Sequence, residues 1–246
     1  MSLILPDIDN RVRIAVKQFW TGRQNQTEKQ LAKERVRDAG TRSSVTGGGH
    51  MDGFVHLVRD SLVHVGLPED CILTGRRGIV VPGYYRPTKQ WDLLAVHKRR
   101  LLAAVEFKSQ VGSIGNNLNN RTEEALGNST DFLKAYEKGL FLKSSQPWVG
   151  WVMVLEDSQI TGRPVMLKED HFPVDPIFRE ASYAGRYQIL AKRMLHERQY
   201  SGASVILTPR KTGASGVYRE PDEELTIRRF VGGLVGHVGG YLSSLK

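Results

Sequence analysis

Two short apolar segments and the charged turn between them, residues 91–108, constrain the fold more than any other part of the chain. Short apolar runs joined by a polar turn predict a β-hairpin, with strands over residues 91–96 and 101–108. We place Arg99 at the centre of a three-residue loop. The resulting cross-strand pairs are Val96 with Leu102, Leu94 with Ala104, and Asp92 with Glu106.

Side chains alternate between the two faces of such a hairpin. One face is expected to carry Asp92, Glu106 and Lys108 together at one end. The opposite face is expected to carry only apolar side chains, namely Trp91, Leu93, Ala95, Ala103, Val105 and Phe107. The pattern therefore concentrates charge at one end of an otherwise apolar hairpin.

Asp92 and Glu106 face each other in this register, and like charges directly opposite one another destabilise a sheet. Two carboxylates about 5 Å apart repel unless positive charge lies between them. Mg²⁺ suits that position, because it commonly uses one or two carboxylates together with waters and substrate phosphate. The Phe107 carbonyl is a candidate further ligand, and Lys108 is placed to orient an attacking water. The alternative is an ordinary hairpin end with solvated charges, in which Lys108 bridges to Glu106.

The rest of the chain contains both strand-like alternation and the three- and four-residue spacing of amphipathic helices. We expect further strands over residues 71–74, 79–81, 148–156 and 204–208, and helices over 4–20, 28–38, 51–65, 121–138, 183–199 and from about 223. This order predicts a mixed central β-sheet flanked by helices. The fold class is α/β, with α+β left open.

No linker divides the sequence, so we expect one domain over residues 1–246. Its basic N-terminal helical region, about residues 1–49, forms either an arm or a surface helix. Lys and Arg exceed Asp and Glu by 35 to 26, a net charge of +9, which favours a polyanionic partner such as nucleic acid. Apolar runs fall short of the ~18 residues of a spanning helix, and a single cysteine fits a reducing cytoplasm.

Asp92 followed by Glu106-Phe107-Lys108 resembles the active site of the PD-(D/E)xK nucleases, although Trp91 and not proline precedes the first acid. Longer segments resemble the XhoI-type restriction endonucleases. These segments are residues 48–54, 82–92, 104–109 and 115–125, and the likeness continues through 148–151 to 171–174.

The resemblance implies a restriction-endonuclease-like fold and a bacterial, cytoplasmic type II restriction endonuclease. Such an enzyme is a homodimer that cuts both strands of palindromic double-stranded DNA with Mg²⁺ and leaves 5′-phosphate ends. For XhoI-like enzymes the site is 5′-CTCGAG-3′, cut after the first C, and a cognate DNA methyltransferase acts on the same site. Asp92 and Glu106 would bind the metal, and Lys108 would assist the attacking water.

A polar segment over residues 112–121 leaves the strand that ends with Lys108, and we expect it to form a loop that reaches DNA bases. Its candidate base contacts are Asn116, Asn117, Asn119, Asn120 and Arg121. The alternative is a turn with a helix cap near Asn120. Arg86 and Lys89 are candidates for phosphate contacts, or belong to a solvated turn.

Other polar residues allow weaker expectations. Asp52 and Glu34 are candidate extra acids for the site, although a helix cap or a surface charge explains either, and His50 and His171 have no assigned role. Two other functions stay open from the residues alone. One is a structure-selective DNA repair or recombination nuclease, and the other is a non-catalytic basic DNA-binding protein.

Overall fold

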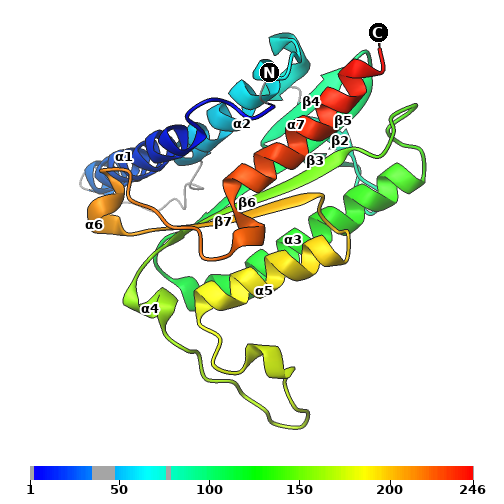
Figure 1. The fold of residues 1–246 in the computed structure, drawn as a ribbon. Helices are drawn as coiled ribbons and strands as arrows, with labels where there is room; N and C mark the ends of the chain where they lie inside the picture. Colours follow the sequence, from blue (N-terminus) through cyan, green and yellow to red (C-terminus); the bar gives the residue numbers. More distant parts are fainter. Residues whose placement is uncertain (1–2, 35–47, 76–78, 246) are drawn as a thin grey trace.

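The computed structural model describes residues 3–34, 48–75 and 79–245, and its centre is a five-stranded sheet (Figure 1). In sheet order the strands are β1 (Ile72–Thr74), β4 (Leu93–His97), β5 (Arg100–Gln110), β6 (Trp148–Glu156) and β7 (Gly202–Thr208). β1, β4 and β5 pair antiparallel, whereas β5, β6 and β7 pair parallel. The predicted mixed sheet is confirmed.

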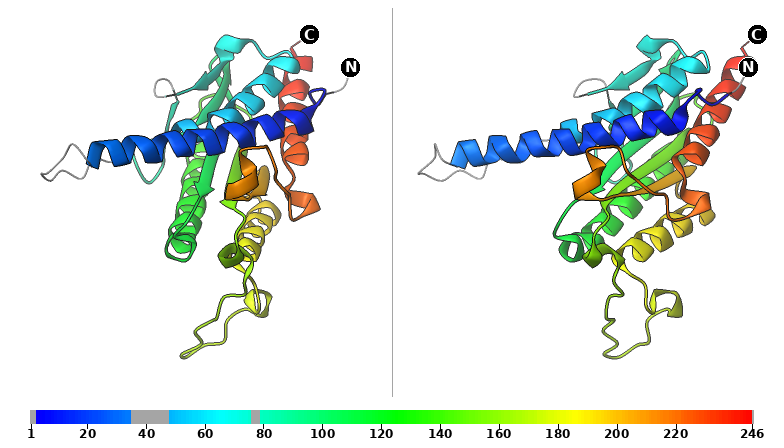
Figure 2. Two further views of the ribbon diagram at one scale, coloured as in Figure 1. Left: turned by 90° about the vertical axis from the view of Figure 1, so that its left-hand side faces the viewer. Right: turned by 60° about the vertical axis from the view of Figure 1, so that its left-hand side comes forward.

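Helices cover both faces of this sheet (Figures 1 and 2). One face packs against α1 (Ile8–Glu34), α2 (Asp52–His64) and α7 (Ile227–Ser243). The other face packs against α3 (Ile114–Glu137) and α5 (Tyr183–His196). Each layer has its own apolar core, so the α/β class is confirmed.

Several short elements connect these layers. They are the 3₁₀ helices η1 (Gly48–Met51), η2 (Glu69–Cys71), η3 (Pro176–Phe178) and η4 (Glu223–Leu225), the short helices α4 (Gln159–Gly162) and α6 (Arg210–Gly213), and the strands β2 (Val80–Pro82) and β3 (Thr88–Gln90). β2 and β3 form a separate two-stranded antiparallel sheet. The sequence did not predict β3, because Thr-Lys-Gln has no apolar alternation.

The first helix begins later and runs further than expected. It starts at Ile8 instead of residue 4, and its buried residues recur at helical spacing from Ile8 through Val12 and Phe19. The expected separate helix over 28–38 continues α1 as far as Glu34, and its remainder lies outside the described residues. Figure 2 shows the last turns of α1 reaching beyond the edge of the sheet.

The β4–β5 hairpin follows the predicted register only near the site. Leu94 pairs with Ala104 as expected, but the register shifts between Ala95 and Val96, so Val96 pairs with Leu101 and not with Leu102. The turn has two residues, Lys98 and Arg99, whose φ angles are 49° and 61°. Two left-handed residues give a turn whose twist matches that of the flanking strands, and this turn replaces the three-residue loop.

Trp91 lies on the face opposite to the predicted one. β4 begins only at Leu93, and the chain bends at Asp92, so alternation does not extend back to Trp91. The backbone N–H of Trp91 donates to the Ile79 carbonyl at 2.9 Å, and the centroid of the Trp91 ring lies 5.1 Å from that of the Phe132 ring in α3. Trp91 therefore belongs to the core beneath α3.

The expected loop over residues 112–121 is wrong, because α3 begins at Ile114. Ile114, Leu118 and Ala125 are buried at helical spacing, and burying them outweighs the turn preference of the intervening asparagines. Helix therefore begins before the predicted start at residue 121. Within the described part of the chain, no helix is both long and apolar enough to cross a membrane.

Candidate active site

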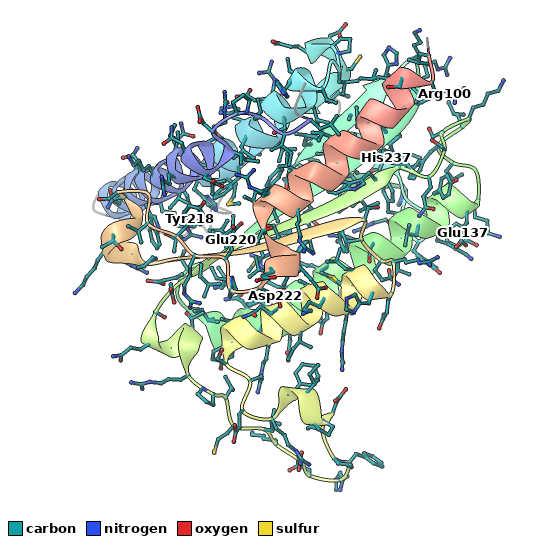
Figure 3. The ribbon with its side chains drawn as sticks, in the orientation of Figure 1. Arg100, Glu137, Tyr218, Glu220, Asp222 and His237 are labelled. Atoms are coloured by element: carbon teal, nitrogen blue, oxygen red, sulfur yellow. The ribbon has the colours of Figure 1, made fainter. Side chains whose placement is uncertain are left out.

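Glu106 and Lys108 project from the second half of β5 toward α3. The strand begins at Arg100, which Figure 3 labels at its far end. Glu106 is only 2% exposed, and the Lys108 Nζ lies 3.0 Å from its Oε1 atom. The predicted pair is therefore in direct contact, inside the layer between the sheet and α3.

Asp92 joins this pair from the bend before β4. Its Oδ2 atom accepts a hydrogen bond of 2.7 Å from the Phe107 N–H, and its own N–H donates to the Val105 carbonyl at 3.2 Å. Asp92 thus lies just beyond the paired residues and is attached to β5 by its side chain. The structure brings Asp92, Glu106 and Lys108 to one place, as the hairpin pattern predicted.

Asp92 is exposed to solvent as a whole residue, but its carboxyl group is held against β5 by the Phe107 N–H and is partly buried there. This burial raises the pKa of Asp92, and the negative charge of Glu106 raises it further. The Phe107 N–H and the two neighbouring lysines act in the opposite direction and do not cancel the effect. A carboxyl group with a raised pKa binds a proton more readily, so protons and cations compete for it.

Glu106 behaves differently although it is more deeply buried. Burial by itself would raise its pKa, but Lys108, Lys89 and the Asn128 amide outweigh burial, and the pKa of Glu106 is lowered. The same ion pair raises the pKa of Lys108 against its own burial. Glu106 and Lys108 are therefore both charged at neutral pH.

Lys89 also belongs to this cluster, although the sequence analysis proposed it only as a phosphate contact. Its Nζ atom lies 3.0 Å from Glu106 Oε1 and 2.7 Å from the Gln90 carbonyl oxygen. It also lies 4.9 Å from the centroid of the Trp91 ring. The predicted phosphate contact of Lys89 stays a prediction, and the structure adds a direct contact with the buried carboxylate.

Asn128 of α3 holds Glu106 from the other side and was not predicted. Its side-chain amide donates to both carboxylate oxygens, at 3.1 Å to Oε1 and 2.8 Å to Oε2. Its own oxygen accepts a hydrogen bond of 2.7 Å from Arg86, and Asn128 is 7% exposed. A buried amide with both ends paired fixes the direction in which Glu106 points.

Asp131, one turn further along α3, fastens the segment that carries Arg86. Its Oδ1 atom accepts hydrogen bonds from the N–H groups of Tyr84 and Tyr85, both at 2.8 Å, and its Oδ2 atom lies 2.8 Å from Arg86 Nε. Arg86 is thus engaged with Asp131 and Asn128, and its predicted DNA contact stays a prediction. The available sequence signal was that Asn128 falls at helical spacing with the apolar Ala125, Phe132 and Ala135 in the predicted helix, with Asp131 three positions after it.

The candidate base-contacting residues all lie in the first turns of α3. Asn119 and Asn120 are exposed, Asn117 donates to the Ser113 carbonyl at 2.9 Å, and Asn116 belongs to the first turn. Arg121 pairs with Glu124 at 2.6 Å, and Glu124 lies 3.7 Å from Lys108. The N-terminal end of α3 therefore adjoins the carboxylate cluster through Glu124 and Lys108.

The other candidates lie elsewhere. Asp52 is exposed at the start of α2, on the face of the sheet opposite to Glu106. His50 Nε2 lies 2.8 Å from the hydroxyl of Ser109 in β5, and His171 is exposed in the connection between α4 and α5. Glu34 ends α1, and its side chain lies outside the described part of the structure.

The sequence is similar to those of known proteins over most of its length. A family model described as restriction endonuclease XhoI matches residues 29–220. The chain belongs to the XhoI restriction endonuclease family.

Individual relatives agree with this membership. The type II restriction enzyme BstVI of Geobacillus stearothermophilus is 42% identical over 208 residues, which cover 82% of this chain and 92% of that protein. The type II restriction enzyme XhoI of Xanthomonas vasicola is 41% identical over 197 residues, 79% of this chain and 78% of that protein. The type II restriction enzyme AbrI of Azospirillum brasilense is 46% identical over 159 residues, 64% of this chain and 71% of that protein. No solved structure gives a significant match.

Family membership confirms the enzyme class expected from the sequence, a type II restriction endonuclease. The matched residues 29–220 include Asp92, Glu106 and Lys108. Neither alternative, a structure-selective repair nuclease or a non-catalytic DNA-binding protein, agrees with this membership.

The cluster offers a donor set that fits Mg²⁺. In the described part of the chain, no three side chains of His, Cys, Asp or Glu gather at one point. Asp92 and Glu106 supply two carboxylates, which is the number that a Mg²⁺ ion sharing its coordination with waters and substrate phosphate commonly uses. Asp92 would bind through the edge that faces solvent, and Glu106 through a carboxylate that two lysines now neutralise.

A surface pocket of about 620 Å³ lies away from this cluster. It is lined mainly by residues 215–223, between α6 and α7, where Figure 3 labels Tyr218, Glu220 and Asp222. None of the cluster residues contributes to it. The candidate active site is therefore recognised by its charged groups and not by the size of a cavity.

Proposed function

We propose that this enzyme hydrolyses phosphodiester bonds of double-stranded DNA in a Mg²⁺-dependent reaction at a palindromic site. The proposed site is 5′-CTCGAG-3′, cut after the first C to leave 5′-phosphate ends, because the chain is 41% identical to an enzyme named XhoI over most of its length. The observation that carries the proposal is the buried Glu106, with Lys108 beside it on β5 and Asp92 beside it in the bend before β4.

Each residue of the cluster has a proposed role. Asp92 and Glu106 hold the metal, with the Phe107 carbonyl as a further ligand. The bound ion would supply positive charge to the scissile phosphate and lower the pKa of a water molecule. Lys108 orients the attacking water and stabilises charge that develops on the phosphate. Asn128 keeps Glu106 in place, and the Phe107 N–H does the same for Asp92.

DNA is proposed to lie across the first turns of α3. The exposed Asn119 and Asn120 would reach base edges, with Asn116, Asn117 and Arg121 beside them on the same helical end. This end adjoins the cluster through Glu124 and Lys108, so base contacts and the scissile phosphate would be held together. Arg86 and Lys89 would then act near the phosphate backbone.

The enzyme is proposed to act as a homodimer of single-domain subunits over residues 1–246. A palindrome presents two equivalent strands, which a two-fold dimer matches. Each subunit carries +9, so the dimer attracts DNA electrostatically before any site is found. Action in the bacterial cytoplasm would require a cognate DNA methyltransferase that protects the host's own sites.

One digest tests the proposal. Purified protein is incubated with Mg²⁺ and a mapped plasmid that contains a single 5′-CTCGAG-3′ sequence, and with the same plasmid in which that sequence is mutated. The proposal predicts one cut at the intact site, none in the mutated plasmid, and none in EDTA. Discrete cutting at another sequence would overturn the proposed site but not the proposed hydrolysis. Failure to cut any unmodified DNA would overturn both.

A further inference from the structure

Two ammonium groups contact the same carboxylate oxygen of Glu106. Lys89 and Lys108 each place Nζ 3.0 Å from Oε1, and the Asn128 amide lies 3.1 Å from the same atom. Among the residues that the structure describes, Asn128 is the one partner of the other oxygen, Oε2, at 2.8 Å. Two cations held at a single oxygen repel each other, so the second one requires an explanation.

The charges of the cluster balance without any metal. Lys89 and Lys108 carry two positive charges, and Asp92 and Glu106 carry two negative charges when ionised. A divalent cation that entered this neutral cluster would leave it with two uncompensated positive charges in a poorly hydrated place. Withdrawal of one lysine reduces that excess, and an incoming DNA phosphate removes the rest.

Lys89 is better placed to withdraw than Lys108. Lys108 lies on β5, at the centre of the main sheet, whereas Lys89 lies on β3 in the separate two-stranded sheet. The Lys89 ammonium also has the Gln90 carbonyl at 2.7 Å and the face of Trp91 at 4.9 Å, and both stay available after contact with Glu106 is lost. Lys89 therefore keeps two close partners when it leaves Glu106, whereas Lys108 has Glu124 at 3.7 Å.

We propose that Lys89 occupies the place of the divalent cation on Glu106 in the metal-free enzyme and is displaced when the cation binds. Lys89 is thus a positioning residue that keeps the buried carboxylate charged and oriented between reactions. This inference rests on the proposed function, because it takes Glu106 to be a metal ligand.

Metal binding by the full-length protein without DNA tests this role. Mn²⁺ is titrated into the wild type and into Lys89→Met, and free Mn²⁺ is followed by electron paramagnetic resonance. Methionine keeps an apolar side chain over Trp91 and removes the competing charge. We expect Lys89→Met to bind Mn²⁺ roughly tenfold more tightly than the wild type. Lys89→Arg restores the competing charge and is expected to bind as weakly as the wild type.

Matched variants separate local competition from general electrostatics. Lys143→Met removes one exposed positive charge beyond the far end of α3, and roughly a twofold change or less is expected there because solvent screens it. Adding Glu106→Gln to Lys89→Met should abolish the gain in Mn²⁺ affinity, because the carboxylate that binds the cation is lost. If Lys89→Met does not fold, as judged by thermal denaturation, Lys89→Gln takes its place in the same titration.

Equal Mn²⁺ affinity in the Lys89 and Lys143 variants, or weaker binding after the loss of Lys89, would overturn the inference. The result is independent of cleavage. A wild type that cuts DNA while Lys89→Met shows no gain leaves the proposed function standing and removes this role of Lys89. A gain in Mn²⁺ affinity in Lys89→Met, together with no cleavage of any DNA by the wild type, supports this role of Lys89 and overturns the proposed function.

Discussion

The side-chain amide of Asn128 donates hydrogen bonds to both carboxylate oxygens of Glu106, from a helix that begins four residues after the strand bearing Glu106 ends. The amide oxygen is in turn paired with Arg86 at 2.7 Å. Glu106 is therefore oriented by a different layer of the fold from the one that carries it. Groups that orient a metal ligand commonly change activity when they are removed, even though they do not touch the metal.

Asn128→Ala should reduce the cleavage rate by about 10–100-fold, because Glu106 loses the donor that fixes both of its oxygens. DNA binding in Ca²⁺ should stay within a few-fold of the wild type, since Asn128 is buried. Single-turnover cleavage and a gel-shift titration measure the two quantities. Asn128→Asp should be more damaging than Asn128→Ala, because it places a second carboxylate against Glu106. Wild-type cleavage by Asn128→Ala would contradict the positioning role.

Asp131→Ala should destabilise the fold, because the N–H groups of Tyr84 and Tyr85 lose their shared acceptor and Arg86 loses its ion pair. The Arg86 side chain is 41% exposed, so solvent weakens the ion pair, and we expect a loss of about 2 kcal/mol in the free energy of unfolding. Urea denaturation measures it. Asp175→Ala removes an exposed ion pair with Arg193 and a hydrogen bond from the Ile177 N–H, and it should destabilise the fold much less because solvent screens the pair. Equal costs in the two variants would contradict the anchoring role of Asp131.

The raised pKa of Asp92 predicts how metal binding depends on pH. Protonated Asp92 is a poor ligand, so Mn²⁺ affinity should rise as the pH increases through a value above the ordinary aspartate pKa of about 3.9. Glu106 contributes little to this rise, because its pKa is lowered and it is already ionised there. Mn²⁺ titrations across pH measure the effect. Asp92→Asn should bind more weakly and lose this rise, and an unchanged pH profile in that variant would assign the titration to another group.

The sequence predicted what depends on local alternation. Asp92, Glu106 and Lys108 meet because they lie on a hairpin, where residue spacing alone places side chains together. The resemblance to the XhoI-type restriction endonucleases added the family, which the matched residues 29–220 confirm.

Contacts between layers were not predictable in the same way. Asn128 and Lys89 reach Glu106 only because α3 and the β2–β3 sheet pack over β5, and neither arrangement follows from residue spacing. The start of α3 was misplaced because asparagines favour turns locally, whereas burial of Ile114 and Leu118 decides the outcome. Trp91 was assigned to the wrong face because the bend at Asp92 interrupts the alternation.

The most direct measurement compares Glu106→Gln with the wild type on a DNA duplex that contains one 5′-CTCGAG-3′ site. Glutamine preserves the size of the side chain and removes its charge. Cleavage with Mg²⁺ is followed under single-turnover conditions, and binding to the same duplex is measured in EDTA. We predict that the wild type cuts the duplex, and that Glu106→Gln binds it within a few-fold of wild-type affinity but cuts at least about 1000-fold more slowly. Cleavage by Glu106→Gln at the wild-type rate would place the chemistry elsewhere and contradict the account.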